Sequence, residues 1–386
     1  MGMAKPVGGQ RDGHVLWSLS LASFLHDVGS DMVFSVWPLF VTQVLGANMA
    51  ILGLIDGIGD AVVSVSGAVG GYLSDKMRKR KLFVWTGYLM GSIARIGYAL
   101  SPSWPWLIPF RLLDRSGKIR SAPRDAIVSD ISMRQNRASR FGILRAMDNF
   151  GAVTGILLAV ILLPLLGYTN LFLVASIPSV IAVVLIVVTI RDPSATPAVF
   201  GGIRFRDVGV NLKLFTLASA LFALGSFSYS FLLLFAKDYG FAATRVPLLY
   251  LVFTIVAAFV SIPAGKLADS IGRKKVVLLS YFSWIVVILA MLWFPGTTGI
   301  LVAFMMYGLH KGALEPVQKT FVAELAPKEY TASTIGAFQM VIGLVALPAS
   351  LITGLLWDSF SPSAAFMLSL ALTTLSILLL LFVRED

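Results

Sequence analysis

Residues 110–130, FRLLDRSGKIRSAPRDAIVSD, place eight charged side chains within a chain that is mostly apolar. Each residue of an α-helix turns by about 100°, so a continuous helix over this stretch would have two charged faces. Surrounding hydrocarbon tolerates such a helix only where both faces meet protein or water. The stretch therefore predicts a polar path through the interior of a membrane protein. One face would hold Arg111, Asp114, Arg115, Lys118 and Asp125, and the opposite face would hold Arg120 and Arg124.

The composition excludes an ordinary soluble domain. Hydrophobic residues make up 57% and charged residues 13% of the 386 residues, and the mean hydropathy is +0.84. Soluble domains carry about 25% charged residues. Apolar blocks of about 20 residues, the length that spans a bilayer, recur along the whole chain and predict an all-α membrane protein with twelve transmembrane helices. The predicted spans are 15–45, 49–73, 82–101, 104–130, 140–166, 170–190, 211–239, 245–265, 276–294, 297–323, 332–356 and 362–383.

The net charge of +11 lies mainly in alternate connections between the spans. Lysine and arginine concentrate in 74–81, 131–140, 191–213 and 266–275, and the other connections hold almost none. In so apolar a chain this pattern indicates membrane orientation rather than nucleic-acid binding. The positive-inside rule places these connections and both termini in the cytoplasm, in a protein of the cell membrane. The first apolar block is too long for a signal-peptide core, so we expect a retained span.

The chain repeats itself with an offset of 194 residues. Segment 191–213 is the longest polar connection, and it divides the chain into a half at 1–190, a cytoplasmic linker at 191–210 and a half at 211–386. Both halves have the same predicted orientation, so the repeat is parallel, about an axis along the membrane normal. The offset places Gly71 on Gly265, Leu73 on Leu267, Asp75 on Asp269, Arg80 on Lys274, Lys81 on Lys275, Asp130 on Glu324 and Gly142 on Gly336.

The loop GKLADSIGRKK, at 265–275, resembles the signature loop G-x-L-x-D-x-x-G-R-K of the major facilitator superfamily. The first-half copy has Arg78 where that family usually has glycine. The resemblance implies that Asp75 latches a closed cytoplasmic gate, with Arg140 or Asp130 nearby. The alternative is that the basic residues only enforce topology. Residues 110–125 also resemble a run found in a bacterial and archaeal branch of the superfamily. The predicted gating set is Gly71, Asp75, Arg80, Lys81, Asp130, Arg140, Gly265, Asp269, Gly272, Arg273, Lys274 and Glu324.

Seventeen charged residues lie within the predicted spans and away from the loops. At roughly 3 kcal/mol each, their exposure to lipid would cost on the order of 50 kcal/mol, which exceeds a net protein stability of about 5–15 kcal/mol. These groups must therefore pair with one another, line a wet cavity or lie near the membrane edge. Many of them are three or four residues apart, a spacing that stacks side chains on one side of a helix and supports pairing. These pairs are Asp27 and Asp31, Asp56 and Asp60, Arg111 and Arg115, Asp114 and Lys118, Lys311 and Glu315, and Arg145 and Asp148.

Four aspartates are the candidates for proton coupling. Asp27 and Asp31 lie mid-span in the first helix, where neighbouring carboxylates in an apolar setting suit reversible protonation. Asp56 and Asp60 form a second pair with the same spacing. The alternative is that each aspartate is the permanent ion-pair partner of an arginine in the fourth span.

The best candidates for contact with an anion are Arg111, Arg115 and Lys118, because arginine forks match carboxylate or phosphate. The alternative is that neighbouring acids already neutralise them. His310 suggests either a titrating group or a structural histidine. Gly151 and Gly155 form a small-xxx-small face that predicts close helix packing. The predicted substrate-binding set is Arg111, Asp114, Arg115, Lys118, Arg145, Asp148, His310, Lys311 and Glu315.

These patterns predict a proton-coupled secondary transporter that works by alternating access, with efflux favoured slightly over uptake of an organic anion by symport. A transporter-like sensor or channel is the remote alternative. An enzyme is not expected, because G-x-S-x-G, H-E-x-x-H and cysteine nucleophiles are absent from the sequence. The dipeptide at 117–118 lacks the rest of a phosphate loop, so ATP is not the expected driver. We expect no cofactor or metal, and as partners only a small solute, protons and the bilayer, with the chain acting as a monomer.

Overall fold

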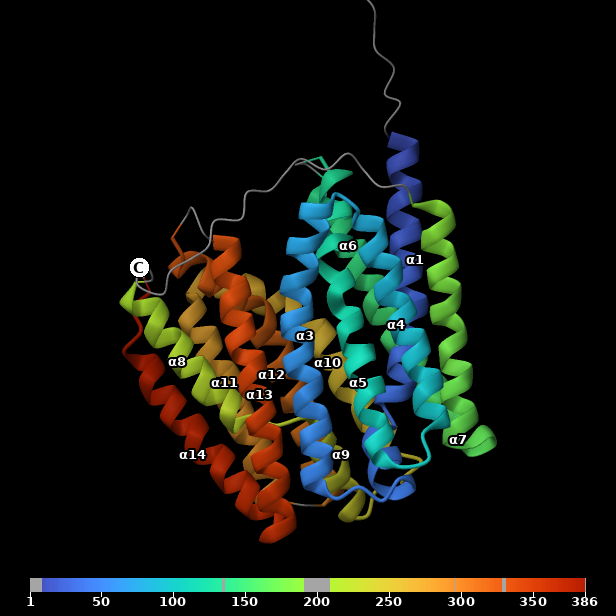
Figure 1. Cartoon of the computed structure of the whole chain (residues 1–386). Coiled ribbons are helices and arrows are strands. Elements are labelled where there is room, and N and C mark those ends of the chain that lie inside the picture. Colours follow the sequence, from blue (N-terminus) through green and yellow to red (C-terminus); the bar gives the residue numbers. More distant parts are fainter. Residues whose placement is uncertain (1–8, 134–135, 191–208, 295, 328–330, 386) are drawn as a thin grey trace, which may run out of the picture. The chain divides into compact units, whose positions relative to one another are not determined.

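The computed structural model describes residues 9–133, 136–190, 209–294, 296–327 and 331–385. Every regular element in these residues is a helix (Figure 1). The elements are α1 (Gly9–Phe34), α2 (Trp37–Leu39), η1 (Phe40–Val44), α3 (Met49–Met77), α4 (Arg80–Leu100), η2 (Trp104–Trp106), α5 (Leu107–Ser116), η3 (Gly117–Arg120), α6 (Ser121–Asp130), α7 (Arg137–Thr189), α8 (Val210–Gly225), α9 (Tyr229–Asp238), α10 (Val246–Ile271), α11 (Arg273–Trp293), α12 (Thr297–Leu325), α13 (Thr331–Ser359) and α14 (Pro362–Leu381).

These elements make twelve membrane helices, as the hydropathy pattern predicts. Seven helical segments of the described residues are long and apolar enough to cross a membrane. One of them, α7, holds two spans, because its backbone breaks at Gly167, where φ is 70°. Another combines α8 and α9. The remaining four spans are α1, α4, the α5–α6 segment and α12, which carry many of the intramembrane charges.

The helices form two compact units. Unit 1 contains residues 1–33, 66–101 and 109–199, and unit 2 contains 34–65, 102–108 and 200–386. The boundary falls within α3, so the first part of this helix packs with elements of the second half of the chain. The halves 1–190 and 211–386 stay a prediction, as does the linker 191–210, most of which lies outside the described residues.

Unit 1 is built around close packing of α1 on α7. A Cβ added at Gly151 would lie 2.5 Å from the carbonyl oxygen of Phe24, and one added at Gly155 would lie 2.9 Å from the carbonyl carbon of Val28. Real Cβ atoms do not approach backbone so closely. The small-xxx-small face is therefore confirmed as a helix contact.

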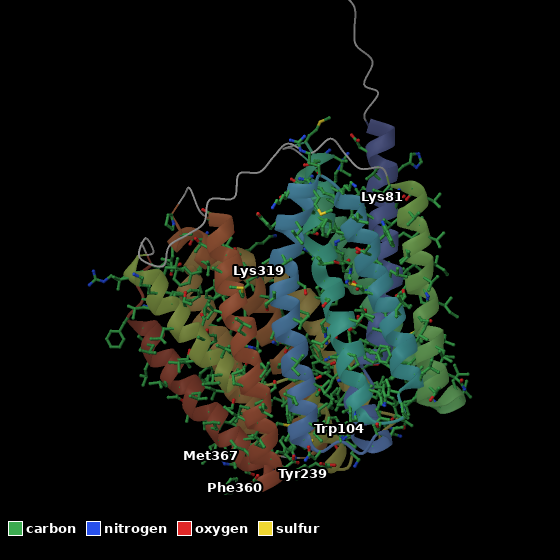
Figure 2. All side chains as sticks on the ribbon, viewed as in Figure 1. Lys81, Trp104, Tyr239, Lys319, Phe360 and Met367 are labelled. Atoms are coloured by element: carbon green, nitrogen blue, oxygen red, sulfur yellow. The ribbon has the colours of Figure 1, made fainter. Side chains whose placement is uncertain are left out.

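Unit 2 packs α12 against α10 and α11, and α8 against α13 and α14. An aromatic cluster fills the space between them, with Phe222 stacked on Tyr281 at a centroid distance of 3.9 Å. The two ends of unit 2 differ in character. Lys319 lies toward one end, and Trp104, Tyr239 and Phe360 lie at the other (Figure 2). Aromatic side chains of this kind are enriched where membrane helices meet the headgroups.

The fourth span is not one continuous α-helix. The segment 117–120 is a 3₁₀-helix between α5 and α6. A 3₁₀-helix turns about 20° more per residue than an α-helix, and four such residues rotate α6 by about 80° relative to the prediction. This rotation moves Arg124 and Asp125 together, because both lie in α6. The assignment of these two residues to opposite faces is wrong for a different reason: they are neighbours in the sequence, and their side chains contact each other at 3.3 Å within one ion-pair network.

The loop between α3 and α4 makes its tight turn with an arginine. Arg78 has φ 56° and is the single non-glycine residue with positive φ in the described chain. The corresponding residue of the second half, Gly272, has φ 102°. A left-handed conformation costs a non-glycine residue roughly 1–2 kcal/mol.

We expect Arg78→Gly to stabilise the protein by up to about 1 kcal/mol, because glycine adopts this conformation without strain. Thermal unfolding in detergent, followed by tryptophan fluorescence, measures the change. Lys79→Gly, one residue later, is the control and should not stabilise the protein, because φ at Lys79 is −126°. A lower unfolding temperature for Arg78→Gly than for the parent would contradict the strain argument.

Candidate functional site

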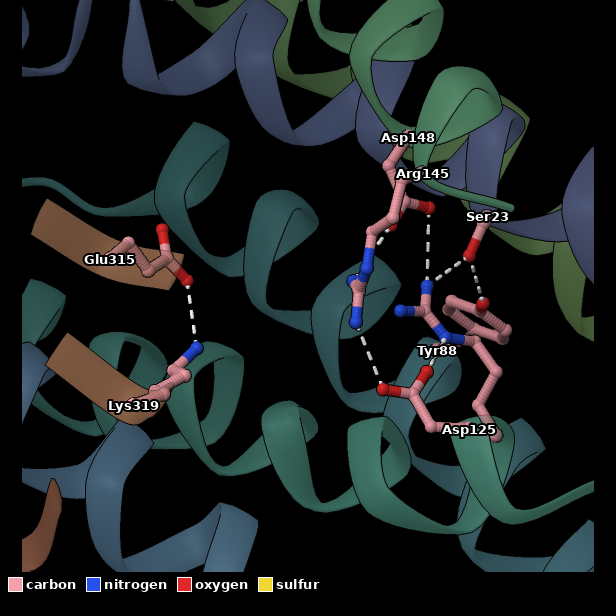
Figure 3. Close-up of polar contacts among 8 residues, drawn as sticks. Ser23, Tyr88, Asp125, Arg145, Asp148, Glu315 and Lys319 are labelled. Atoms are coloured by element: carbon pink, nitrogen blue, oxygen red, sulfur yellow. Dashed lines mark hydrogen bonds and ion pairs between the residues drawn. The ribbon is translucent and has the colours of Figure 1, made fainter. Parts of the chain in front are cut away.

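Four charged side chains of unit 1 form a closed ring between α6 and α7 (Figure 3). Arg124 contacts Asp125 through Nε at 3.3 Å and Asp148 through Nη1 at 3.2 Å. Arg145 contacts the other oxygens of the same two carboxylates, at 2.9 Å and 3.2 Å respectively. Two arginines and two aspartates thus neutralise one another. The side chain of Arg145 is 56% exposed and that of Arg124 only 8%, so the ring is wet on one edge and dry on the other.

The dry edge of the ring ties in two further helices. Arg124 donates a hydrogen bond to the Ser23 hydroxyl of α1, which lies 3.0 Å from the Tyr88 hydroxyl of α4. Arg120 lies over the same tyrosine ring, 4.9 Å from its centroid, and donates to the carbonyl of Gly117 at 2.8 Å. These contacts fix α1, α4, α6 and α7 around one polar centre.

Deeper in unit 1, Arg95 is surrounded by neutral acceptors. It donates to Ser30 Oγ at 2.6 Å, to Ser179 Oγ, and to the carbonyl oxygens of His26 and Ala175. The His26 Nε2 lies 3.4 Å from the same guanidinium. Because every N–H of an arginine donates, this histidine nitrogen must accept. Arg95 therefore serves as a hub between α1, α4 and α7.

The α5 side chains form a second charged group in unit 1. Arg111 and Asp114 are buried, and Arg115 Nε lies 3.9 Å from an Asp114 oxygen. The Tyr98 hydroxyl donates to the carbonyl of Phe110 at 3.4 Å and lies within electrostatic range of Arg111 and Asp114. The structure thus brings three of the predicted substrate-binding residues together on α5.

Asp27 and Lys118 stand apart from these pairs. Both are partly exposed, and within the described part of the chain neither has a hydrogen bond or ion pair. Each lies in the electrostatic range of the other and of Arg124. The predicted pairing of Lys118 with Asp114, four residues earlier, is not observed. One acid and one amine are thus available to a ligand or a proton at the edge of the saturated ring.

The predicted residues of the second half lie in unit 2 and do not form one cluster. Lys311 lies 5.7 Å from the centroid of the Tyr307 ring, within electrostatic range of Asp60 and Glu315. Glu315 forms its ion pair with Lys319, at 3.0 Å, rather than with Lys311 as predicted (Figure 3).

Two further predicted residues of unit 2 are buried. His310 Nδ1 lies 2.9 Å from the carbonyl oxygen of Ser280, among aromatic rings, as the structural alternative predicts. Asp56 accepts three hydrogen bonds from neutral donors. Asp31 lies on α1 in unit 1, one turn beyond Asp27.

The two signature loops make equivalent bridges. In unit 1, Arg80 contacts Asp75 at 3.2 Å and also contacts Asp130. In unit 2, Arg273 contacts both Asp269 and Glu324 at 2.9 Å. In each case the arginine lies at the start of one membrane span. It joins the signature aspartate of the preceding span to an acid at the end of the following span. Arg140 does not join the first bridge and donates instead to the carbonyl of Ile131.

These bridges correct the repeat alignment within the loops. The constant offset of 194 places Arg80 on Lys274 and Lys81 on Lys275, and the contacts show that this pairing is wrong. Lys81 donates to the carbonyl of Val187 at 2.7 Å, and Lys274 donates to that of Leu381 at 2.8 Å. Arg80 therefore corresponds to Arg273, and Lys81 corresponds to Lys274, at an offset one residue shorter than 194. The reason is that Lys79 intervenes between the turn and α4, whereas α11 begins directly after Gly272.

Across the described residues, no group of three or more histidine, cysteine, aspartate or glutamate side chains could hold a metal ion. The ring members Arg124 and Asp125 are the main residues that the sequence analysis left out of the site. The pair Arg145 and Asp148 was a usable signal, but the sequence did not show which helix supplies its partners.

Comparison with known proteins places this architecture. The family model of the Major Facilitator Superfamily matches residues 19–212 and 214–386. The chain belongs to this superfamily. An uncharacterized MFS-type transporter of Methanocaldococcus jannaschii, MJ1317, is 35% identical over 378 residues, covering 95% of this chain and 94% of that protein. The chain is therefore a secondary transporter, a multi-pass integral membrane protein and not an enzyme.

Two other proteins are similar to this chain over different extents. The multidrug resistance protein MdtH of Citrobacter koseri is 32% identical over 131 residues, which is 32% of each chain. A variant of the nucleoside transporter NupG has a solved structure that matches with a TM-score of 0.81 at 14% identity, covering 95% of this chain and 98% of that one. The NupG match supports the fold alone.

Proposed function

We propose that this transporter couples the movement of a small polar or charged solute to protons. Asp27 is the foremost proton site, supported by Asp31, with Asp56 and Asp60 as the second pair. The solute contacts Arg111, Arg115 and Lys118. The single observation that carries this proposal is the state of Asp27 and Lys118, which have no direct partner in the described residues although the ring beside them is fully paired.

The direction of transport that we favour is efflux in exchange for protons. The MdtH match supports it, since the name of that protein refers to multidrug resistance. The second candidate is proton-coupled uptake of an organic anion, which the charges within the spans of unit 1 favour. Basic residues outnumber acidic residues there. The basic residues are Arg95, Arg111, Arg115, Lys118, Arg120, Arg124 and Arg145, and the acidic residues are Asp27, Asp31, Asp114, Asp125 and Asp148. In both cases we place the termini in the cytoplasm, treat the chain as a monomer, and assign the gating set to alternating access.

Asp27→Asn tests the coupling. Proteoliposomes that contain a pH-sensitive dye are exposed to a panel of sugars, nucleosides, organic acids and cationic drugs. We expect at least one solute to move protons through the parent and none to move protons through Asp27→Asn, because a carboxamide is not ionisable at neutral pH and cannot carry a proton as a carboxylate does.

Asp238→Asn is the matched control, because Asp238 pairs with Lys237 at the exposed end of α9. It should leave the proton movement unchanged. Solute flux that is the same with and without a pH gradient would contradict proton coupling, and full proton movement through Asp27→Asn would contradict the site.

A further inference from the structure

Asp56 of unit 2 accepts hydrogen bonds from three side chains. It lies on α3 and is only 2% exposed. One carboxylate oxygen accepts from Trp37 Nε1 at 3.0 Å, and the other accepts from Ser228 Oγ at 2.7 Å and Ser230 Oγ at 2.5 Å. A buried carboxylate with three donors is strongly held, because hydrogen bonds to charged groups are the strong ones.

The donors belong to parts of the chain far apart in sequence. Trp37 lies in α2, whereas Ser228 and Ser230 lie at the break between α8 and α9. Ser228 is also the N-cap of α9, where its hydroxyl accepts from the amide of Ser230. The negative charge of Asp56 therefore lies at the positive end of the α9 dipole. The carboxylate joins the segment 34–65 to the second half of the chain.

Further contacts join the same two parts of the chain. Asp358, at the end of α13, accepts from the amides of Met49 at 3.1 Å and Ala50 at 2.8 Å and so caps the start of α3. The Tyr229 hydroxyl donates to the carbonyl of Phe34 at 3.2 Å. The start of α3 and the end of α13 lie at the same end of unit 2 (Figure 1).

Between these polar contacts, α3 and α13 meet backbone to backbone. A Cβ at Gly53 would lie 2.8 Å from the carbonyl carbon of Ser350, and one at Gly57 would lie 2.7 Å from the Cα of Leu347. No water-filled path fits through so close a contact. The segment 34–65 is thus closed against the second half at this end.

We infer that Asp56 is a positioning residue for transport, which holds this end of unit 2 shut. Alternating access requires the first half to move against the second around the site. Opening toward this end separates 34–65 from α9 and α13, and the hydrogen bonds of Asp56 break in each cycle. This role is separate from the proton coupling proposed for the pair Asp56 and Asp60, because it depends on the three hydrogen-bond donors around Asp56.

The chain has no cysteine, so a single introduced thiol reports on this contact. Ser350→Cys places a thiol on α13 at a side chain that is 2% exposed. The reporter protein is reconstituted and treated with a small, water-soluble methanethiosulfonate. We expect Asp56→Ala in this background to raise the labelling rate at least tenfold, because the closed state loses all three hydrogen bonds.

Two further variants keep the inference testable if Asp56→Ala fails to fold. The double variant Ser228→Ala/Ser230→Ala and the single variant Trp37→Phe remove donors while leaving the acid in place, and each should raise the labelling rate. Thr42→Val is the matched control, because it removes a hydrogen bond that stays inside the segment 34–65, to the carbonyl of Pro38 at 2.7 Å, and it should label at the parent rate.

Labelling of the folded donor variants within twofold of the parent rate would overturn the inference. An equal increase in Thr42→Val would also overturn it, because the effect would then not be specific to the contacts of Asp56. Neither result depends on the identity of the solute or on proton coupling, so failure of this inference is distinguishable from failure of the proposed function.

Discussion

Arg124→Ala is expected to destabilise the protein by about 3–5 kcal/mol, the cost of removing one partner from a buried ion pair. Arg124 is the dry corner of the ring, and its loss leaves Asp148, whose side chain is 16% exposed, with only the wet partner Arg145. The Ser23 hydroxyl loses its donor in the same step. Unfolding in mixed detergent and SDS, followed by tryptophan fluorescence, measures the change in free energy.

Lys319→Ala is the matched control for this experiment. Lys319 and Glu315 also form an ion pair, at 3.0 Å, but the Glu315 side chain is 75% exposed. Exposed pairs contribute about 0–1 kcal/mol. The double variant Arg124→Ala/Asp148→Ala should be less destabilised than the sum of its single variants, because the uncompensated carboxylate is removed. A cost for Arg124→Ala as small as that for Lys319→Ala would contradict a structural role for the ring.

The second large effect is expected at Gly155. Gly155→Ala should destabilise the protein by about 3 kcal/mol, the upper part of the range for overpacking. The added Cβ would lie within 3.0 Å of both the carbonyl carbon and the Cα of Val28. These are backbone atoms of α1, so no side chain can rotate away and the two helices must separate. The same SDS unfolding experiment measures the loss.

Gly142→Ala provides the comparison on the same helix. A Cβ at Gly142 meets nothing within 4 Å, and alanine is favoured over glycine in a helix by about 1 kcal/mol. We therefore expect Gly142→Ala to be neutral or stabilising. If Gly155→Ala were as stable as Gly142→Ala, the close packing of α1 on α7 would be wrong.

The number and order of the membrane helices follow from hydropathy, because a span must satisfy its backbone internally and present apolar side chains to lipid. The fourth span shows where this reasoning stops. Periodicity alone could not show that residues 117–120 would form a 3₁₀-helix. The consequent rotation turned the whole of α6, with Arg124 and Asp125 together, relative to α5 and so changed which charges of the two helices share a face.

Pairs within one helix were predicted from spacing, and such predictions were only partly successful. Arg145 and Asp148, three residues apart, do pair, whereas Glu315 turns to Lys319 instead of Lys311. Both choices are allowed by helical geometry, and the tertiary surroundings decide between them. Partners on other helices, such as Ser228 for Asp56, carry no local signal in the sequence.

The extra residue before α4 determines how the two signature loops can be exchanged in an engineered chain. Replacing the first loop residue by residue at the constant offset of 194 would substitute lysine for Arg80. A lysine ammonium lacks the planar guanidinium with which arginine contacts two carboxylates at once. If residues 269–274 replace residues 75–81 as one segment, the turn, the arginine and the lysine keep their positions relative to one another. The loop is therefore portable as a cassette and not as a set of point substitutions.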